Sequence, residues 1–258
     1  MSDARIKVGV VGAGGRMGRT VAAAVDTDPA LDLVAAVDPH AAGVELFGTT
    51  VAASVDALAE AGAEVVVDFT VAPAARDTLP WLAAHGMHAV VGTTGFTDDD
   101  LSAFRSEFSG SNCLIAANFA ISAVLMMRFA ELAAPYFDTA EIIELHHDRK
   151  IDAPSGTAVT TARRMAAAKG EWAEDPTEQV VFEGARGGVG PAGIHLHSVR
   201  MRGMVAHQEV ILGSEGQTLI IRQDSYDRTS FMPGVVLACK RIAEVPGLTL
   251  GLDAILGV

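Results

Sequence analysis

The sequence has few cysteines and no long uninterrupted apolar run. Cys113 and Cys239 are the only cysteines in 258 residues, which excludes a disulfide framework and a cysteine zinc site. The longest apolar stretch, residues 120–137, contains Arg128 and Glu131, and charges are rare at mid-depth in a membrane helix. We therefore expect a buried helix in this stretch and two buried thiols in a reducing compartment.

Positive charge is also scarce. The chain has 19 Lys and Arg against 32 Asp and Glu, a formal net charge of -13, so it repels polyanions at long range. Nucleic acid and membrane surfaces are not expected partners, and an anionic ligand requires a local basic site. Charged residues Asp3, Arg5 and Lys7 lead directly into a short apolar run, which does not resemble a signal peptide and predicts a cytoplasmic location.

Short apolar runs alternate with amphipathic stretches in the first half of the chain. Strands are predicted near 6–12, 32–37, 64–69, 88–92 and 112–117. Because each run is almost wholly apolar, both faces of the sheet should be covered by helices, as in a doubly wound Rossmann-type parallel sheet of an α/β protein. Thr97, with Asp100 three residues later, predicts a capping box at a helix start.

The second half follows a different pattern. It predicts a long helix after residue 120, a strand at 139–147, a helix at 156–169, and further strands near 194–201, 205–213 and 217–224, before a last helix at 229–244. A run of strands after helices indicates a second α+β domain built on an open mixed sheet.

A glycine-rich turn, GAGGRMG, follows the first predicted strand. Gly12, Gly14 or Gly15, and Gly18 allow a tight turn and a close approach of backbone N–H groups to a pyrophosphate. The pattern departs from GxGxxG: counted from Gly12, the template places its last glycine at position 17, where this chain has Met17, and the glycine follows one residue later as Gly18. Alone it equally fits an ordinary turn.

Asp38 lies at the end of the second predicted strand, roughly 20 residues past the glycines, where a carboxylate accepts hydrogen bonds from an adenosine ribose. By itself it also fits a solvated residue before Pro39. The glycine turn, the helix and this acidic strand end together favour dinucleotide binding. No basic residue follows Asp38 directly, so we expect NAD(H) to be used at least as well as NADP(H).

Two further strands end in Asp68-Phe69-Thr70 and Gly92-Thr93-Thr94-Gly95. The carboxyl ends of parallel strands share one edge of the sheet, so both segments are placed to contact the ribose and nicotinamide. Either segment alone is also explained as a turn.

The segment 144–158, ELHHDRKIDAPSGTA, combines basic residues with a helix start. Ser155, Gly156 and Thr157 open a helix whose N–H groups attract a carboxylate. Lys150 adds a positive charge, and His146 or His147 can deliver a proton near neutral pH. The two histidines diverge unless the strand ends there, and they are too few for a metal site. A strand-edge histidine pair, a surface lysine and a plain N-cap stay open as alternatives.

These segments resemble the 4-hydroxy-tetrahydrodipicolinate reductase (dihydrodipicolinate reductase) family over nearly the whole chain. The matching segments are GAGGRMG (12–18), DFT (68–70), VGTTGF (91–96), AANF (116–119), ELHHDRKIDAPSGTA (144–158) and DRTSFMPG (227–234). The resemblance implies reduction by NADH or NADPH of the dehydrated hydroxy substrate to tetrahydrodipicolinate, in lysine and diaminopimelate biosynthesis.

The resemblance also implies roles for individual residues. His146 would be the catalytic proton donor and acceptor, and Lys150 a second proton donor that also binds a substrate carboxylate. The substrate-binding residues would be His147, Ser155, Gly156 and Thr157. The cofactor-binding residues would be Gly12, Ala13, Gly14, Gly15, Arg16, Met17, Asp38, Gly92, Thr93, Thr94, Ala116, Ala117, Asn118 and Phe119.

Domain limits and assembly follow from the same resemblance. Residues 1–117 with 229–258 would form the dinucleotide-binding domain, and residues 118–228 the substrate-binding and oligomerisation domain of a homotetramer. Two other functions stay open at this stage: a small two-domain amino-acid dehydrogenase of the aspartate type, and an NAD-binding sensor without catalysis. A sensor has no need for both His146 and Lys150 beside an anion-binding turn.

Overall fold

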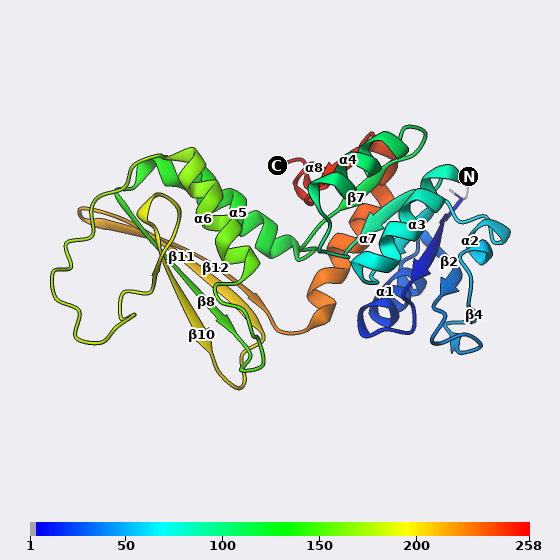
Figure 1. Cartoon of the computed structure of the whole chain (residues 1–258), viewed down its shortest axis with the longest axis horizontal. Helices are drawn as coiled ribbons and strands as arrows, with labels where there is room; N and C mark the ends of the chain where they lie inside the picture. The colour runs from blue at the N-terminus through cyan, green and yellow to red at the C-terminus, as the bar shows by residue number, and fades with distance from the viewer. Residues whose placement is uncertain (1–3) are drawn as a thin grey trace. The chain divides into compact units, whose positions relative to one another are not determined.

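The computed structural model describes residues 4–258, which form two compact units (Figure 1). Unit 1 comprises residues 4–121 and 228–258, and unit 2 comprises residues 122–227. The elements of unit 1 are β1 (Ile6–Val11), α1 (Arg16–Thr27), β2 (Leu31–Val37), β3 (Glu45–Leu46), β4 (Thr49–Ala52), α2 (Asp56–Glu60), β5 (Val65–Asp68), α3 (Ala72–Ala84), β6 (His88–Val91), α4 (Asp98–Glu107), β7 (Cys113–Ile115), α7 (Met232–Arg241), β13 (Leu248–Leu250) and α8 (Asp253–Leu256). The elements of unit 2 are α5 (Ile121–Ala133), β8 (Thr139–His146), α6 (Gly156–Ala168), β9 (Gly188–Val189), β10 (His195–Arg200), β11 (Ala206–Ser214) and β12 (Gln217–Ser225).

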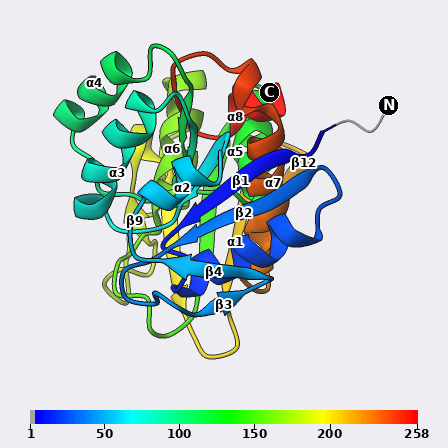
Figure 2. The same cartoon turned by 90° about the vertical axis from the view of Figure 1, so that its right-hand side faces the viewer.

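The sheet of unit 1 has the strand order β13-β7-β6-β5-β1-β2-β4-β3. Strand β1 pairs in parallel with β2 on one side and β5 on the other, and Figure 2 shows β1, β2 and β4 following one another across the sheet. All four residues of β5 are buried, as expected where helices cover both faces. The predicted doubly wound parallel sheet is confirmed, and β3 is its antiparallel exception.

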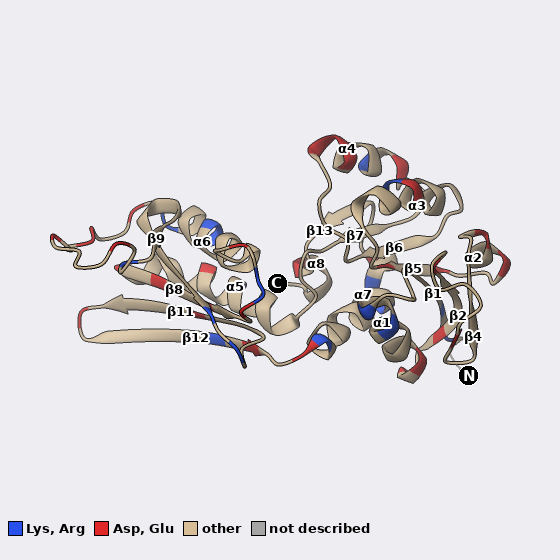
Figure 3. Cartoon of the chain, turned by 60° about the horizontal axis from the view of Figure 1, so that its bottom comes forward, with Lys and Arg blue, Asp and Glu red and all other residues tan. Residues whose placement is uncertain are grey.

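The start of α4 follows its sequence signal. The Thr97 side chain accepts from the Asp100 N–H at 3.2 Å, while the Asp100 carboxylate accepts from the Thr97 N–H at 2.7 Å. This is the predicted capping box, and it satisfies two N–H groups at the start of α4. Asp98, Asp99 and Asp100 all lie in the first turn, where the helix dipole favours negative charge, and Figure 3 shows this acidic end in red.

Helix α7 packs on α1 and on strands β1, β5 and β6 of unit 1. It is shorter than the helix predicted at 229–244, because 3-10 turns flank it at Arg228–Phe231 and Ile242–Glu244. Both cysteines are buried in this unit, Cys113 on β7 and Cys239 on α7. Their expected role as small core residues is confirmed.

The sheet of unit 2 has the order β12-β11-β8-β10-β9, with β8 at its centre. Strand β8 pairs antiparallel with β11 and parallel with β10, so the sheet is mixed, as predicted. Along β8 the side chains of Ile142 and Glu144 are fully buried, and alternate residues of a strand share one face. This arrangement puts Glu144 and His146 on the same face as Ile142.

Candidate active site

The glycine-rich turn joins β1 to α1 in unit 1. Gly12 has φ +77°, a left-handed conformation that favours glycine. A Cβ on Gly18 would lie 2.0 Å from the Gly12 carbonyl oxygen, so Gly18 allows the first turn of α1 to pack against the glycine turn. The glycine that arrives one residue late is therefore the one that packs helix against turn.

Asp38 holds the glycine turn from the end of β2. Its Oδ2 accepts from the Gly14 N–H at 3.0 Å, and its Oδ1 accepts from the His40 N–H at 2.9 Å. A carboxylate has further lone pairs on both oxygens, so these bonds leave acceptor capacity for a ribose. A cavity of about 480 Å³ opens beside this carboxylate and is lined by Gly12, Gly15, His40, Phe69 and Thr70, among others. These residues fit the adenosine half of a dinucleotide.

Asp68 joins two of the predicted strand ends. Its Oδ1 accepts from the Thr70 N–H at 2.9 Å, the Thr70 hydroxyl at 2.7 Å and the Thr93 hydroxyl at 2.8 Å. The carboxyl group is fully buried, and burial raises its pKa against these hydrogen bonds. Asp68 thus fixes Thr70 and Thr93 at the edge of the sheet that carries the glycine turn.

The segment 116–119 meets the same edge. The Ala116 N–H donates to the Val91 carbonyl at 3.0 Å, and the ring of Phe119 lies 5.7 Å from the ring of Phe69. A Cβ on Gly92 would lie 2.1 Å from the Phe69 ring. Unit 1 therefore brings its five predicted cofactor segments together at the carboxyl ends of β1, β2, β5, β6 and β7.

The predicted proton donor, His146, is the last residue of β8 in unit 2. Its Nδ1 lies 2.5 Å from Glu144 Oε2. Arg200, on the neighbouring strand β10, donates from Nη1 to Oε2 at 2.8 Å and from Nη2 to Oε1 at 2.7 Å. Burial raises the pKa of Glu144, but the bonds from His146 and Arg200 outweigh it and lower the pKa to about 2. Glu144 is therefore an anion.

The helix start predicted to bind an anion lies directly beside this carboxylate. The Ser155 hydroxyl caps α6 by accepting from the Ala158 N–H at 3.2 Å, and the Ser155 N–H donates to Glu144 Oε1 at 3.1 Å. A Cβ on Gly156 would meet nothing within 4 Å. Because α6 spans 13 residues, its first turn carries the partial positive charge that attracts a carboxylate.

Lys150 is engaged by a neighbour in this structure. Its Nζ donates to both Asp152 oxygens at 2.9 Å, and the Asp152 side chain is 60% exposed. His147 follows the end of β8, and its Nδ1 is buried with no hydrogen-bond partner among residues 4–258. Unit 2 thus brings His146 beside the start of α6, while Lys150 is held by Asp152.

Three residues near this site were not predicted to have a role: Glu144, Asp152 and Arg200. Arg200 is 56 residues from Glu144 in the sequence, and no local spacing relates them. Glu144 had a usable signal, because it is a charged residue two positions after Ile142 on a strand with a buried face. A carboxylate at such a position requires a cationic partner.

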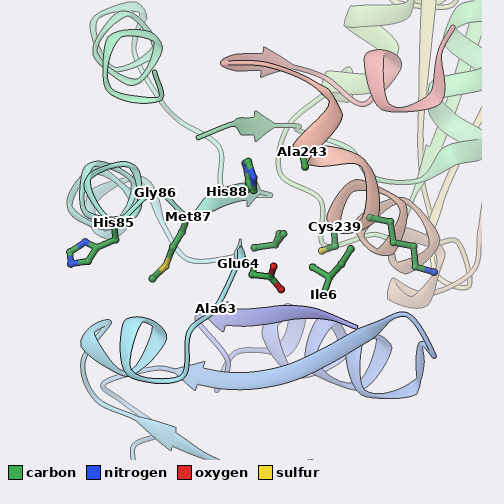
Figure 4. Close-up of a pocket in the computed structure, with 11 residues that line it drawn as sticks. Ile6, Ala63, Glu64, His85, Gly86, Met87, His88, Cys239 and Ala243 are labelled. Carbon is green, nitrogen blue, oxygen red and sulfur yellow. The ribbon is translucent and has the colours of Figure 1, made fainter. Parts of the chain in front are cut away.

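A second cavity, of about 370 Å³, lies at the amino ends of β1, β5 and β6 in unit 1 (Figure 4). Its described lining includes none of the predicted cofactor residues. Its charged groups are already engaged: Lys240 Nζ donates to Asp28 at 2.7 Å, and Glu64 Oε2 accepts from the Lys7 N–H at 2.9 Å. This cavity therefore has no evident connection with the dinucleotide.

Two features of residues 4–258 concern membrane-spanning helices and metal sites. Within residues 4–258, no helix is both long and apolar enough to cross a membrane. The same residues contain no group of three or more His, Cys, Asp or Glu side chains that could hold a metal ion.

A doubly wound unit with a glycine turn, together with a second unit that presents a histidine beside a helix start, defines a two-domain dinucleotide-dependent oxidoreductase. Family models described as dihydrodipicolinate reductase, N-terminus, and dihydrodipicolinate reductase, C-terminus, match residues 6–119 and 122–256. The chain belongs to the dihydrodipicolinate reductase family and is an NAD(P)H-dependent oxidoreductase, which confirms the predicted resemblance.

Individual relatives agree. The 4-hydroxy-tetrahydrodipicolinate reductase of Corynebacterium aurimucosum is 50% identical over 98% of this chain and 99% of its own length. That of Streptomyces coelicolor is 44% identical over 96% and 97%. The solved dipicolinate-bound dihydrodipicolinate reductase of Paenisporosarcina sp. TG-14 has a TM-score of 0.90 at 37% identity, covering 97% of this chain and 99% of that one. An amine dehydrogenase from Mycobacterium smegmatis, with a TM-score of 0.64 at 14% identity over 96% and 95% of the two chains, shares the fold alone.

Proposed function

We propose that this chain reduces the dehydrated form of 4-hydroxy-tetrahydrodipicolinate to tetrahydrodipicolinate in lysine and diaminopimelate biosynthesis. The observation that carries the proposal is the pairing of His146 with the start of α6 through Glu144. The start of a helix can bind a carboxylate of the substrate, and the reduction requires a proton as well as a hydride. The dipicolinate-bound relative supports a small dicarboxylate substrate.

On the cofactor side, residues 12–17 and Asp38 bind the pyrophosphate and the adenosine ribose, and residues 92–94 and 116–119 contact the nicotinamide half. Bound NADH or NADPH supplies the hydride. A Cβ at Gly14 would lie 2.4 Å from the Ala41 Cβ and 2.9 Å from Asp38 Oδ2, so only glycine lets this turn pack against Asp38 and donate its N–H to that carboxylate. The fit of the glycines to a pyrophosphate supports the assignment.

On the substrate side, His146 donates the proton that completes the reduction, and one carboxylate of the substrate binds the N–H groups at the start of α6. Ser155, Gly156, Thr157 and His147 surround that carboxylate. Lys150 binds the other carboxylate and is a second proton donor. Since Asp152 is exposed and holds Lys150 by one ion pair, a dianionic substrate displaces it at small cost, because exposed ion pairs contribute about 0–1 kcal/mol.

The adenosine cavity supports the expectation that NAD(H) is used at least as well as NADP(H). Asp38 and Asp77 both line it, and His40 is its one basic residue in the described lining. A 2'-phosphate placed beside two carboxylates is repelled. Catalytic efficiencies with NADH and NADPH test this expectation, and a preference for NADPH above tenfold would refute it.

We further propose a cytoplasmic homotetramer assembled through the sheet of unit 2. Exposed apolar residues support this assembly: Leu219 and Ile220 on β12, and Val181 and Phe182 in the segment before β9. Exposed apolar side chains gathered on one unit are typical of an interface. Sedimentation equilibrium of the full chain tests the proposal, and a monomeric mass at micromolar concentration would contradict it.

The decisive assay follows NADH absorbance with the hydroxy substrate. We expect His146→Ala and Lys150→Ala each to lower kcat by about two orders of magnitude, the usual scale for a lost proton donor. NADH binding should survive both substitutions. Wild-type turnover in either variant would remove that residue from the mechanism. An absence of turnover in the wild type would favour a sensor, and activity with an amino acid instead would favour the dehydrogenase alternative.

Gly156→Ala tests whether the substrate binds at the start of α6. The added methyl group meets nothing in the folded chain, and Ala has a higher helix propensity than Gly. We therefore expect unchanged or increased thermal stability together with a raised KM for the substrate. An unchanged KM would show that no ligand contacts this helix start. Gly110→Ala, another site where a Cβ meets nothing within 4 Å, is the matched control in unit 1.

A further inference from the structure

Glu144 is a fully buried carboxylate on the central strand of unit 2. Its two oxygens accept one hydrogen bond from His146, two from Arg200 and one from the Ser155 N–H, and the Ser198 side chain also hydrogen-bonds to this carboxylate. One side chain therefore connects the predicted proton donor with the predicted carboxylate-binding helix start. No role for it follows from the sequence motif alone.

The arrangement determines which nitrogen of His146 carries the proton. Arg200 donates to both oxygens of Glu144 and is itself always protonated. Glu144 is therefore ionised and can only accept, so the Nδ1 atom 2.5 Å away must donate. In the neutral imidazole the second nitrogen, Nε2, is then the unprotonated one.

Both terminal nitrogens of Arg200 are engaged in this framework, whereas its buried Nε has no hydrogen-bond partner among residues 4–258. Besides Glu144, its Nη1 donates to the Val199 carbonyl at 2.8 Å and its Nη2 donates to the Asp152 carbonyl at 2.7 Å. Its charge cancels that of Glu144. The Glu144 carboxylate can therefore accept from the imidazole, while the neutral Glu144–Arg200 pair does not repel a dianionic substrate at long range.

We propose that Glu144 is a positioning residue of the reaction, which holds His146 in the Nδ1–H form and leaves Nε2 to exchange the proton with the substrate. This inference rests on the proposed function. The protonated imidazole breaks its Nε2–H bond as that proton forms a bond to the substrate, which has taken the hydride. The imidazole left behind is protonated on Nδ1, the form that Glu144 already binds. Solvent then returns a proton to Nε2.

Glu144→Gln tests the proposal, because it keeps the size of the side chain and replaces one acceptor with an NH2 donor. With its carbonyl oxygen in the Oε1 position, where Arg200 Nη2 and the Ser155 N–H donate, the amide has its NH2 group in the Oε2 position, facing His146 Nδ1 and Arg200 Nη1. A donor facing Nδ1 favours the Nε2–H tautomer. We therefore expect kcat to fall at least tenfold, with KM for the substrate changed less than threefold and NADH binding unchanged.

The spectroscopic readout is the tautomer of His146, measured by long-range 1H–15N correlation on histidine-labelled protein at a pH where the imidazole is neutral. The signal is assigned by its absence in His146→Gln. We expect Nδ1–H in the wild type and a shift toward Nε2–H in Glu144→Gln. The same tautomer in both proteins, or a kcat within twofold of the wild type, would overturn the proposal.

Glu141→Gln is the matched control. Glu141 also lies on β8 and also binds an arginine and a histidine, because Arg186 Nη2 donates to it at 2.6 Å and the His197 ring nitrogen Nε2 contacts its other oxygen. Neither partner is His146, so this variant should keep the wild-type kcat and His146 tautomer. A kcat loss equal to that of Glu144→Gln would show that any lost ion pair in the sheet has the same effect, and would overturn the proposal.

The experiment distinguishes failure of this proposal from misfolding of the variant and from failure of the proposed function. Should Glu144→Gln not fold, as judged by circular dichroism, Glu144→Asp retains the charge but withdraws the carboxylate by one methylene. The same loss of kcat and of tautomer preference is then expected, and their retention overturns the proposal. Failure of the proposed function appears as no turnover in the wild type, whereas failure of this proposal appears in Glu144 variants of an active enzyme.

Discussion

Gly18→Ala provides a quantitative test of the glycine turn. The new Cβ would lie 2.0 Å from the Gly12 carbonyl oxygen and 2.7 Å from its carbon, against 3.4 Å for the shortest ordinary contact. The difference, 3.4 − 2.0, requires backbone to separate from backbone by about 1.4 Å. A flexible side chain could rotate away, but two backbone segments have to shift together.

The expected cost follows from two opposing effects. Overpacking of this kind costs about 1–3 kcal/mol, and Ala in place of Gly inside a helix returns about 1 kcal/mol. The net loss in folding free energy is therefore about 0–2 kcal/mol. If the turn moves to relieve the overlap, its N–H groups no longer meet the pyrophosphate, and a loss of about 1.4 kcal/mol in binding is already tenfold in Kd.

We expect Gly18→Ala to bind NADH at least tenfold more weakly, measured by fluorescence titration, with its Tm lowered by only a few degrees. Gly110→Ala, where the methyl group meets open space, should match the wild type in both. The reasoning is refuted if Gly18→Ala retains both the NADH Kd, within twofold, and the Tm of the wild type. The overlap would then have been absorbed without moving the turn.

Three further predictions concern other parts of the chain. Thr97→Ala removes the capping bond to Asp100 and should cost about 1 kcal/mol of unfolding free energy in urea; no change would show that the capping box is dispensable. Burial raises the pKa of the Cys113 thiol, and it raises that of Cys239 to about 12, so neither should react with a thiol reagent until the protein is unfolded. The folded-state pKa of Glu144, about 2 against an ordinary 4.5, means that its stabilisation is complete above pH 4.5 and disappears as the pH falls through 2. Stability should therefore drop by about 3 kcal/mol over that interval, and Glu144→Gln should flatten this part of the urea-melt pH profile.

The parallel sheet of unit 1 could be predicted because its strands are short and apolar throughout. Strands β1, β5 and β6 are buried on both faces, so composition alone marks them. The short strands β3, β4 and β13, at the two ends of the sheet order, were not predicted. They are two to four residues long, and β3 and β4 pair around a turn at Gly48 instead of forming an apolar run.

The candidate site was predictable to the extent that it is local in sequence. The start of α6 is marked by its own cap, Ser155, and the glycine turn by its own glycines, so short motifs identified both. The hydrogen bonds that complete them are not local. Asp38 reaches Gly14 across 24 residues, Thr93 reaches Asp68 across 25 and Arg200 reaches Glu144 across 56, and only the folded sheets bring these pairs together.

In both units a carboxylate at or near the carboxyl end of a strand accepts from the backbone N–H of a turn that is predicted to bind a ligand. Asp38 accepts from Gly14 in the dinucleotide turn, and Glu144 accepts from Ser155 at the start of α6. Each turn must bind an anion with its remaining N–H groups, so an adjacent carboxylate opposes that binding unless its charge is balanced. Arg200 balances Glu144, whereas the partners proposed for Asp38 are the hydroxyl groups of a ribose, which a carboxylate attracts. Under the proposed function, this difference accounts for the arginine beside the site that receives a dianion, and it agrees with the expectation that NADH is used at least as well as NADPH.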